Sequence, residues 1–200
     1  MGKRILGIVG SYRRNGTIDS LVTAVLSAAE EQGAETEKIY LIDKHIEFCT
    51  NCRTCTQTTG AERGECVHRD DMAGLLDRYD TADGIVIGAP VNCFNLNAIT
   101  RRFMERLVCL TYWPWGKGGY VLRKKSRGKK AVLITSSAMP ALMGRFFTGA
   151  PRALRVIAET MGAKPVALLF AGLSAQKQKA VISSKMTGQA RKAGRKLTSP

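Results

Sequence analysis

Residues 5–21 read ILGIVGSYRRNGTIDSL and give the clearest indication of how this chain folds. Its apolar start, residues 5–9, predicts a buried β-strand, and its end opens a run with apolar residues at helical spacing. In the loop between them, backbone N–H groups and the positive end of the helix dipole converge on one spot. The hydroxyls of Ser11 and Thr17 and the guanidinium of Arg13 add donors that suit phosphate oxygens. The stretch therefore predicts a phosphate-binding loop, with an ordinary strand-to-helix turn as the alternative.

The common nucleotide fingerprints do not occur at this loop. It contains no G-x-G-x-x-G, which is typical of dinucleotide-binding turns, and no G-K-[ST], which is typical of NTP-binding P-loops.

Length and composition favour one globular domain over residues 1–200, with a basic helix or tail from about residue 174. The contents of hydrophobic and charged residues, 44% and 24%, are ordinary for a soluble protein. We expect no membrane span, because no apolar run approaches the ~18 residues that one needs. No signal peptide is evident and the six cysteines are scattered, which favours a cytoplasmic protein without a disulfide framework.

The net charge of +15 is unevenly distributed. Residues 1–100 carry 10 basic and 14 acidic side chains, a net of −4, whereas residues 101–200 carry 21 and two, a net of +19. A binding module that grips nucleic acid or an anionic membrane is one interpretation. Aromatic residues are not interleaved with the basic residues of the tail, so we expect no nucleic-acid partner.

Strands and helices alternate along the chain. The apolar patterns predict strands over residues 5–9, 38–42, 84–88, 131–135 and 166–170, and helices over residues 18–29, 70–79, 99–110 and 151–161, with Ser174 as the cap of a final basic helix. Five strands that alternate with helices predict an α/β fold, a doubly wound parallel sheet with helices on both faces. The strand order 2-1-3-4-5 is one common solution, and it places ligands at the carboxyl ends of the central strands.

This topology predicts that the loops after the first, third and fourth strands meet around one ligand. Residues 88–97 read GAPVNCFNLN, and residues 135–140 read TSSAMP. Both loops offer backbone amides, small residues and short polar side chains, between which a flat ring can lie.

The first loop resembles that of the NADPH-dependent FMN reductase family, which has a flavodoxin-like fold. The pattern G-S-x-R-x-x-G-x-x-x-x-L is matched by residues 10–21, and Pro90-Val91 match the start of the family's third loop. Asn92 departs from the Tyr that often follows, and Phe94 is either a substitute aromatic surface or a core residue. The resemblance implies that FMN is bound by Ser11, Arg13, Asn15, Gly16, Thr17, Ile18, Pro90, Val91, Asn92, Cys93, Phe94, Asn95, Ser136 and Ser137.

The resemblance also implies the reaction. Hydride passes from NAD(P)H to FMN and then to a flavin, a quinone or another small-molecule or protein acceptor. No catalytic side chain is expected, because the flavin carries the chemistry. A homo-oligomer, dimer or tetramer, is typical of the family.

Four cysteines cluster with the spacing Cys49-x2-Cys52-x2-Cys55-x10-Cys66. Such thiolates can hold a [4Fe–4S] cluster or a zinc ion, and a loop of free thiols or a redox pair is the alternative. The motif is similar to that of iron–sulfur flavoproteins, which implies electron transfer fed by a protein donor, although the last spacing in those proteins is usually shorter. For Cys93 and Cys109 we expect packing roles.

Residues 111–128 read TYWPWGKGGYVLRKKSRG and form an unusually long connection. Its aromatic residues Trp113, Trp115 and Tyr120 predict a subunit interface, a lid beside the ring, or a loop pinned to its own core. A basic run follows that could meet the 2′-phosphate of NADPH or form a solvated hairpin: Arg123, Lys124, Lys125, Arg127, Lys129 and Lys130.

Overall fold

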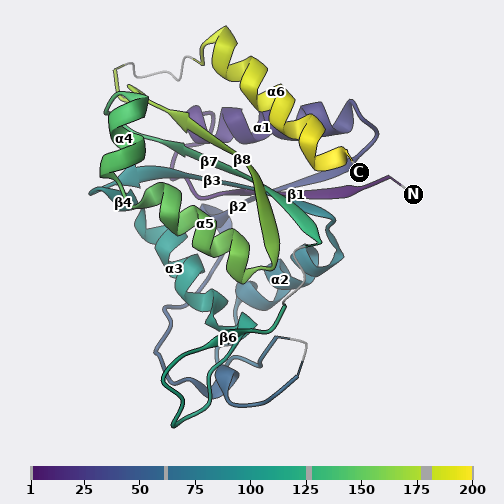
Figure 1. Ribbon diagram of the computed structural model, residues 1–200, viewed down its shortest axis with the longest axis vertical. Coiled ribbons are helices and arrows are strands. Elements are labelled where there is room, and N and C mark those ends of the chain that lie inside the picture. The colour runs from purple at the N-terminus through teal and green to yellow at the C-terminus, as the bar shows by residue number, and fades with distance from the viewer. Residues whose placement is uncertain (1, 61–62, 125–127, 177–181, 200) are drawn as a thin grey trace.

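The central sheet has the predicted strand order. The computed structural model describes residues 2–60, 63–124, 128–176 and 182–199. Five parallel strands follow the order β2-β1-β3-β7-β8, and the short β4 adds to β3 in the antiparallel sense (Figure 1). Their bounds are β1 Arg4–Val9, β2 Glu35–Tyr40, β3 Gly84–Asn92, β4 Asn95–Leu96, β7 Lys129–Ser136 and β8 Ala163–Ala171.

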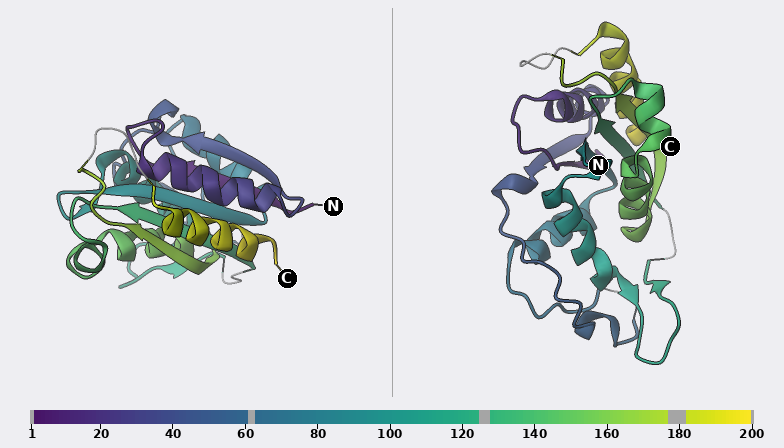
Figure 2. Two further views of the ribbon diagram at one scale, coloured as in Figure 1. Left: turned by 90° about the horizontal axis from the view of Figure 1, so that it is seen from above. Right: turned by 90° about the vertical axis from the view of Figure 1, so that its left-hand side faces the viewer.

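Helices cover both faces of this sheet. On one face, α1 (Thr17–Glu30) packs beside α6 (Ser184–Thr198), as the view from above shows (Figure 2). On the other face lie α2 (Asp71–Thr81), α3 (Ala98–Arg106) and α5 (Ala150–Thr160). Each side has its own cluster of buried apolar residues, because strands covered on both faces carry apolar side chains in both directions. The doubly wound α/β fold is confirmed.

The second strand lies earlier than the sequence predicted. It runs from Glu35 to Tyr40 and not over residues 38–42, since residues 41–43 form the short 3₁₀ helix η1 (Leu41–Asp43). β2 is an edge strand whose only strand partner in the described chain is β1, and most of its side chains are at least partly exposed. The polar residues of β2 therefore look like part of a loop in the sequence. In the structure, pairing with β1 sets the register of the strand.

Three further details of the chain differ from what the sequence predicted. Ser183 caps α6 by accepting a hydrogen bond from the Met186 N–H, whereas Ser174 donates its hydroxyl to the Ser137 carbonyl at 3.0 Å. The short helix α4 (Ala141–Phe147) was not predicted, because its seven residues are too few for a clear helical period. The predicted helix over residues 99–110 is α3 continued by the 3₁₀ helix η3 (Leu107–Leu110).

The cysteine loop and the aromatic segment form a small lobe at one end of the molecule, at the bottom of Figure 1. The lobe contains the 3₁₀ helix η2 (Thr54–Thr56) and a short hairpin of β5 (Thr111–Tyr112) and β6 (Val121–Leu122). Within the described part of the chain, no helix is both long and apolar enough to span a bilayer.

Candidate functional site

A cavity of about 390 Å³ lies at the carboxyl ends of β1, β3 and β7. We call it the carboxyl-end pocket. The loop after β1, the end of β3, the loop after β7 and the loop after β8 contribute its walls. Its lining residues are Ser11, Tyr12, Arg13, Gly16, Thr17, Ile18, Pro90, Val91, Asn92, Ser136, Ser137, Ala138, Ser174 and Ala175.

The loop after β1 is held by contacts within itself and with α1. The Ser11 hydroxyl accepts a hydrogen bond from the Arg13 N–H at 3.1 Å, which folds the start of the loop into a tight turn. Asn15 has a left-handed backbone, φ 56°, and its N–H donates to Asp19 Oδ2 at 2.7 Å. These contacts give the loop a defined shape before any ligand binds.

Asp19 joins this loop to β2 from the first turn of α1. Lys38 Nζ and the Tyr40 hydroxyl both reach Asp19 Oδ1 at 3.0 Å. Burial tends to raise the pKa of the Asp19 carboxyl, but the hydrogen bonds from Asn15, Lys38 and Tyr40 outweigh burial and lower it. Asp19 is therefore an ionised, fully engaged carboxylate beneath the loop.

Gly10 fixes the other end of the loop. Its N–H donates to the Gly88 carbonyl at 2.7 Å, and its carbonyl accepts from Asn97 Nδ2 at 2.7 Å and from Thr100 Oγ1 at 3.1 Å. A Cβ at position 10 would lie 2.2 Å from Thr100 Oγ1, so only glycine fits here. The phosphate-loop pattern thus has glycine at this position because α3 approaches the backbone closely.

Most of the predicted site residues meet at the carboxyl-end pocket. Ten of the fourteen line it: Ser11, Arg13, Gly16, Thr17, Ile18, Pro90, Val91, Asn92, Ser136 and Ser137. Tyr12, Ala138, Ser174 and Ala175 also line it and were missed. Tyr12 and Ala138 are neighbours of predicted residues in the same loops, whereas no sequence signal marked the loop after β8.

The other four predicted residues lie outside the lining. Asn15 faces Asp19, and residues 92–95 form the tight β3–β4 turn, in which Cys93 and Phe94 both have positive φ angles. Two central residues with positive φ are typical of a type I′ hairpin turn. Phe94 is 62% exposed and is therefore not a core residue, and the packing role expected of Cys93 is wrong, because Cys93 is exposed. Cys109 is buried, as expected.

The chemistry of the carboxyl-end pocket suits a phosphorylated ligand with a flat ring. No side chain caps α1. Uncapped N–H groups at the start of a helix are suited to binding an anion. None of the described residues that line the pocket is acidic. Ile18, Pro90 and Val91 add apolar surface beside the hydroxyls of Ser136 and Ser137. Its size falls within the usual range for small-molecule sites.

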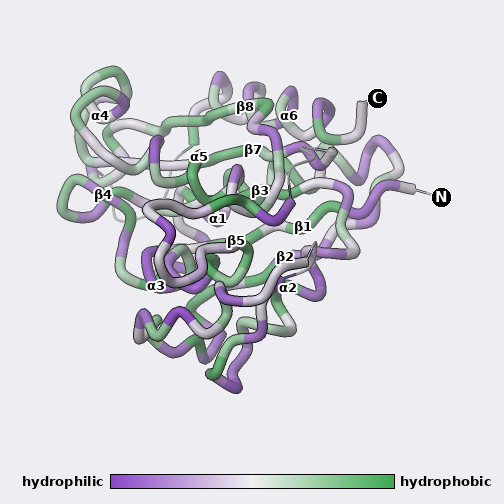
Figure 3. Tube along the Cα trace, turned by 60° about the horizontal axis from the view of Figure 1, so that its bottom comes forward, coloured by the Kyte–Doolittle hydropathy of each residue, from purple (hydrophilic) through white to green (hydrophobic). Residues whose placement is uncertain are grey.

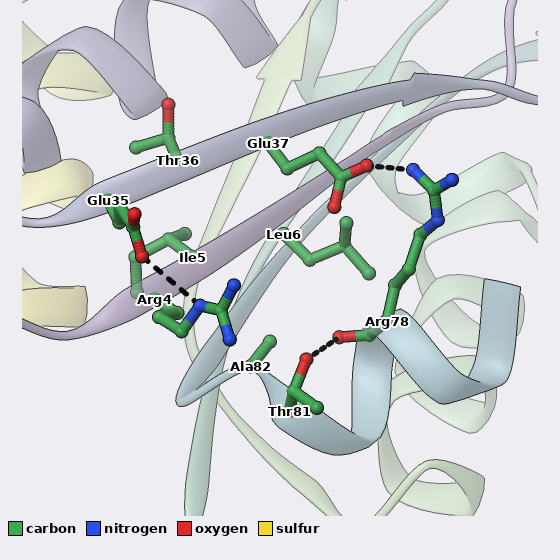
Figure 4. Close-up of a pocket in the computed structure, with 9 residues that line it drawn as sticks. All are labelled: Arg4, Ile5, Leu6, Glu35, Thr36, Glu37, Arg78, Thr81 and Ala82. Carbon is green, nitrogen blue, oxygen red and sulfur yellow. Dashed lines mark hydrogen bonds and ion pairs between the residues drawn. The ribbon is translucent and has the colours of Figure 1, made fainter.

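A second cavity, of about 170 Å³, lies at the amino ends of β1 and β2. Its charged side chains pair with one another, Arg4 with Glu35 and Arg78 with Glu37 (Figure 4). Because these groups already satisfy each other, we assign no ligand to this cavity.

The four clustered cysteines line one pocket in the lobe. Cys49, Cys52, Cys55 and Cys66 contribute to it together with Arg106 and His68. Arg106 is buried, and its Nη2 lies 3.4 Å from Cys66 Sγ. We call this the thiol pocket. The sequence thus predicted the grouping of the four thiols, but not the guanidinium beside them.

The thiols of the lobe differ in their environments. Burial, with the neighbouring Cys66, raises the pKa of Cys55 to about 11, and burial raises that of Cys109 to about 12. Hydrogen bonds from Thr54 lower the pKa of the exposed Cys52. Among the described residues, no three His, Cys, Asp or Glu side chains are arranged around a single metal ion.

The aromatic segment contacts the cysteine loop. The guanidinium of Arg53 lies between the rings of Trp113 and Trp115, 4.0 and 4.1 Å from their centroids. The Trp113 carbonyl accepts hydrogen bonds from Arg53 Nη2 at 2.6 Å and from Thr56 Oγ1 at 3.1 Å. The segment is therefore pinned to its own chain, although Trp115 and Tyr120 remain largely exposed.

The basic run is engaged within the protein where it is described. Arg123 donates to the carbonyls of Cys55, Thr58 and Thr111. Lys124 pairs with Asp80, Lys129 donates to the Tyr79 carbonyl, and Lys130 donates to the Ser199 carbonyl. Lys125 and Arg127 lie outside the described residues. The described members thus have structural partners, and none of them lines the carboxyl-end pocket.

Comparisons with known proteins agree with this geometry. The family model for NADPH-dependent FMN reductases matches residues 3–167. An iron-sulfur flavoprotein of Archaeoglobus fulgidus is 34% identical over 117 residues, which cover 58% of this chain and 51% of that protein. One of Methanocaldococcus jannaschii is 36% identical over 129 residues, 64% of this chain and 61% of that protein. The chain thus spans only about half to three fifths of the length of these curated relatives.

Solved structures share the fold at low sequence identity. The FMN-dependent NADH-azoreductase of Bacillus anthracis, solved in complex with FMN, has a TM-score of 0.70 at 15% identity, with all of both chains covered. The NAD(P)H:quinone oxidoreductase of Methanothermobacter marburgensis has a TM-score of 0.70 at 16% identity and covers 98% of this chain and all of its own.

Proposed function

Because this chain belongs to the NADPH-dependent FMN reductase family, we propose that it binds FMN in the carboxyl-end pocket and oxidises NAD(P)H. The electrons then pass to a flavin, a quinone or another acceptor. When bound, FMN supplies the chemistry by accepting a hydride and releasing electrons singly or in pairs. The protein's part is to bind and orient the reactants.

We assign the phosphate to the loop after β1. Arg13, the hydroxyls of Ser11 and Thr17, and the uncapped start of α1 offer donors in one region of the pocket. We assign the ring to the opposite walls, where Pro90, Val91 and the loop after β7 lie. The observation that carries the proposal is the joining of a donor-rich loop to an apolar wall in a pocket whose described lining has no acidic side chain.

Reconstitution with FMN tests this function. We expect purified protein to retain stoichiometric FMN and to oxidise NADPH or NADH in the presence of an acceptor such as a soluble quinone. Protein that stays colourless after reconstitution, or that holds FMN but never oxidises a nicotinamide, contradicts the proposal.

Two adjacent arginines provide a matched pair of variants. Arg13 lines the pocket, whereas its neighbour Arg14 pairs with Asp43 outside it. Arg13→Ala should weaken FMN binding by tenfold or more, since a hydrogen bond to a charged group contributes about 1.5–3 kcal/mol. Arg14→Ala should stay within about twofold. Equal losses in the two variants argue against our placement of the phosphate.

A second candidate function is electron transfer through an iron–sulfur cluster in the thiol pocket. The observation that favours it is that Cys49, Cys52, Cys55 and Cys66 line one pocket, with the cationic Arg106 in contact with Cys66. In a [4Fe–4S] cluster each cysteine binds a different iron atom, so the thiols stand further apart than around one ion. Four cysteines are the usual ligand set of such a cluster, and a zinc ion held by the same thiols is the alternative.

Anaerobic purification tests the cluster. We expect about four iron atoms and four sulfides per chain in the reconstituted protein. Cys66→Ser should lower the iron content, whereas Cys93→Ser, at the exposed β3–β4 turn, should not. Iron-free wild-type protein that still oxidises NAD(P)H excludes this candidate and leaves the first one standing.

We also propose that the protein is a homodimer formed through α4. Leu142, Met143, Phe146 and Phe147 on this helix are exposed by 49–76%, and Figure 3 shows the apolar helix at the periphery of the molecule. Apolar patches of this kind mark interfaces. Light scattering should give the dimer mass, and Phe146→Glu should yield monomers; a wild-type monomer refutes the dimer.

The six cysteines, all unpaired, support a reducing compartment, and we propose the cytoplasm.

A further inference from the structure

The side chain of Asn97, at the start of α3, does not cap its own helix. Asn97 is the N-cap of α3, yet its side chain makes no capping hydrogen bond. Asn is among the residues most favoured as a cap, because its side chain can accept a hydrogen bond from an N–H of the first helical turn. Instead its Nδ2 donates to the Gly10 carbonyl at 2.7 Å, 87 residues away in the chain. A favourable local interaction is thus replaced by a contact with the loop after β1.

Thr100 completes the arrangement one turn further along α3. Its hydroxyl has one proton, which two acceptors share: Asn97 Oδ1 at 2.6 Å and the Gly10 carbonyl oxygen at 3.1 Å. Asn97 is 1% exposed and Thr100 is 0% exposed, so the whole network is closed to water. In the described part of the chain, these three buried polar groups on two segments are hydrogen-bonded to one another. We call Asn97 and Thr100 the Gly10 clamp.

The clamp fixes the orientation of the peptide group between Gly10 and Ser11. The C=O of Gly10 and the N–H of Ser11 belong to one peptide plane and point in opposite directions, because the peptide bond is trans. With the carbonyl oxygen fixed against α3, the Ser11 N–H is directed away from α3. Ser11 itself lines the carboxyl-end pocket. The clamp thus holds the partially negative Gly10 oxygen against α3. The Ser11 N–H points to the opposite side of the peptide plane.

We propose that the Gly10 clamp is the device that sets the preference of this protein for a flavin carrying a 5′-phosphate over the unphosphorylated flavin. The inference rests on the proposed binding of FMN in the carboxyl-end pocket. Asn97 and Thr100 do not line the pocket and act as positioning residues, through the loop that faces the phosphate. A change in the clamp therefore alters binding of the phosphate and leaves the walls beside the ring as they are.

The test compares the affinities for FMN and for riboflavin, measured by flavin fluorescence on the full chain. Thr100→Val removes the hydroxyl at nearly constant volume, and Asn97→Asp keeps an acceptor for Thr100 but loses the donor to Gly10. Each variant should weaken FMN binding roughly tenfold, while riboflavin binding stays within about twofold. Thr100→Ser, which keeps the hydroxyl, is the matched control and should bind both flavins like the wild type.

The outcomes separate the inference from the proposed function. Wild-type protein that binds neither flavin overturns both. Wild-type protein that binds FMN, with variants that lose FMN and riboflavin affinity by the same factor or lose neither, overturns the inference alone. Thermal unfolding of every variant is recorded in parallel, and if Asn97→Asp does not fold, Thr100→Val against Thr100→Ser decides the question.

Discussion

Arg106 Nη1 lies 2.5 Å from Asp70 Oδ2, and both side chains are at least 98% buried. The pair joins the end of α3 to the N-cap of α2, where Asp70 also accepts hydrogen bonds from the N–H groups of Met72 and Glu47. Arg106 further donates to the Glu47 carbonyl at 2.9 Å and contacts Cys66. The buried pair therefore joins two helices of the α/β domain, and its contacts with Glu47 and Cys66 connect them to the cysteine loop.

Removal of either partner of this pair should be strongly destabilising. Arg106→Met or Asp70→Asn leaves a buried group without its partner and should lower the free energy of unfolding by about 3–5 kcal/mol. In the double variant no uncompensated charge is left, so its loss should be smaller than the sum of the two single losses. Urea unfolding of the three variants measures this coupling. Strictly additive losses contradict it.

The carboxylate of Asp19 should stabilise the loop after β1 in a pH-dependent way. Its pKa lies below the ordinary value of 3.8, so its contribution is complete above that value and is lost as the pH falls through the lowered pKa. At pH 7, Asp19→Asn should cost about 1–3 kcal/mol of unfolding free energy. As the pH falls through the lowered pKa, the gap to the wild type should narrow. The exposed pair of Asp43 with Arg14 provides the control, and Asp43→Asn should cost under about 1 kcal/mol.

Two glycines of α6 should respond to alanine with opposite signs. A Cβ at Gly194 would lie 2.3 Å from the Val25 carbonyl oxygen, because α6 packs closely on α1. Gly194→Ala should therefore destabilise the protein by about 1–3 kcal/mol. At Gly188 nothing lies within 4 Å, and Gly188→Ala should stabilise it by about 0.5–1 kcal/mol. Thermal melting of both variants measures the difference, and a shared sign is incompatible with this packing.

The cysteines of the metal-free protein should react with iodoacetamide in a defined order. The thiolate is the reactive form, so the exposed Cys52, whose pKa is lowered, should react before Cys55 and Cys109, whose pKa values are about 11 and about 12. Peptide mass spectrometry after timed labelling at pH 8 gives the three rates. In guanidinium chloride the rates should converge. If Cys55 reacts first in the native protein, the described environments are wrong.

The positions of the strands and of the pocket loops could be predicted because their signals are local. The apolar runs after Arg4 and Asp83 need only the sequence to identify them as buried strands, and each is followed by a loop of small residues. The edge strand β2 was misplaced because few of its side chains are buried. The cap of α6 was misassigned because Ser174 and Ser183 offer the same hydroxyl, and only the path of the chain decides which of them begins a helix.

The lining of the pocket was predicted less completely than its position. Ser174 and Ala175 come from the loop after β8, which carries no pattern of its own. Cys93 and Phe94 lie outside the lining, at the centre of a turn in which both adopt the left-handed backbone of a hairpin. No rule of spacing marks such a turn in a sequence that lacks glycine there.

Periodicity and spacing along the chain were enough to predict the order of elements, the donor-rich loop at residues 10–17 and the grouping of four cysteines. The folded chain alone reveals that Asn97 and Thr100 hold the Gly10 carbonyl, and that Arg106 contacts both Asp70 and Cys66. These contacts join residues 36–90 positions apart, and their strength comes from burial, which the folded chain as a whole creates.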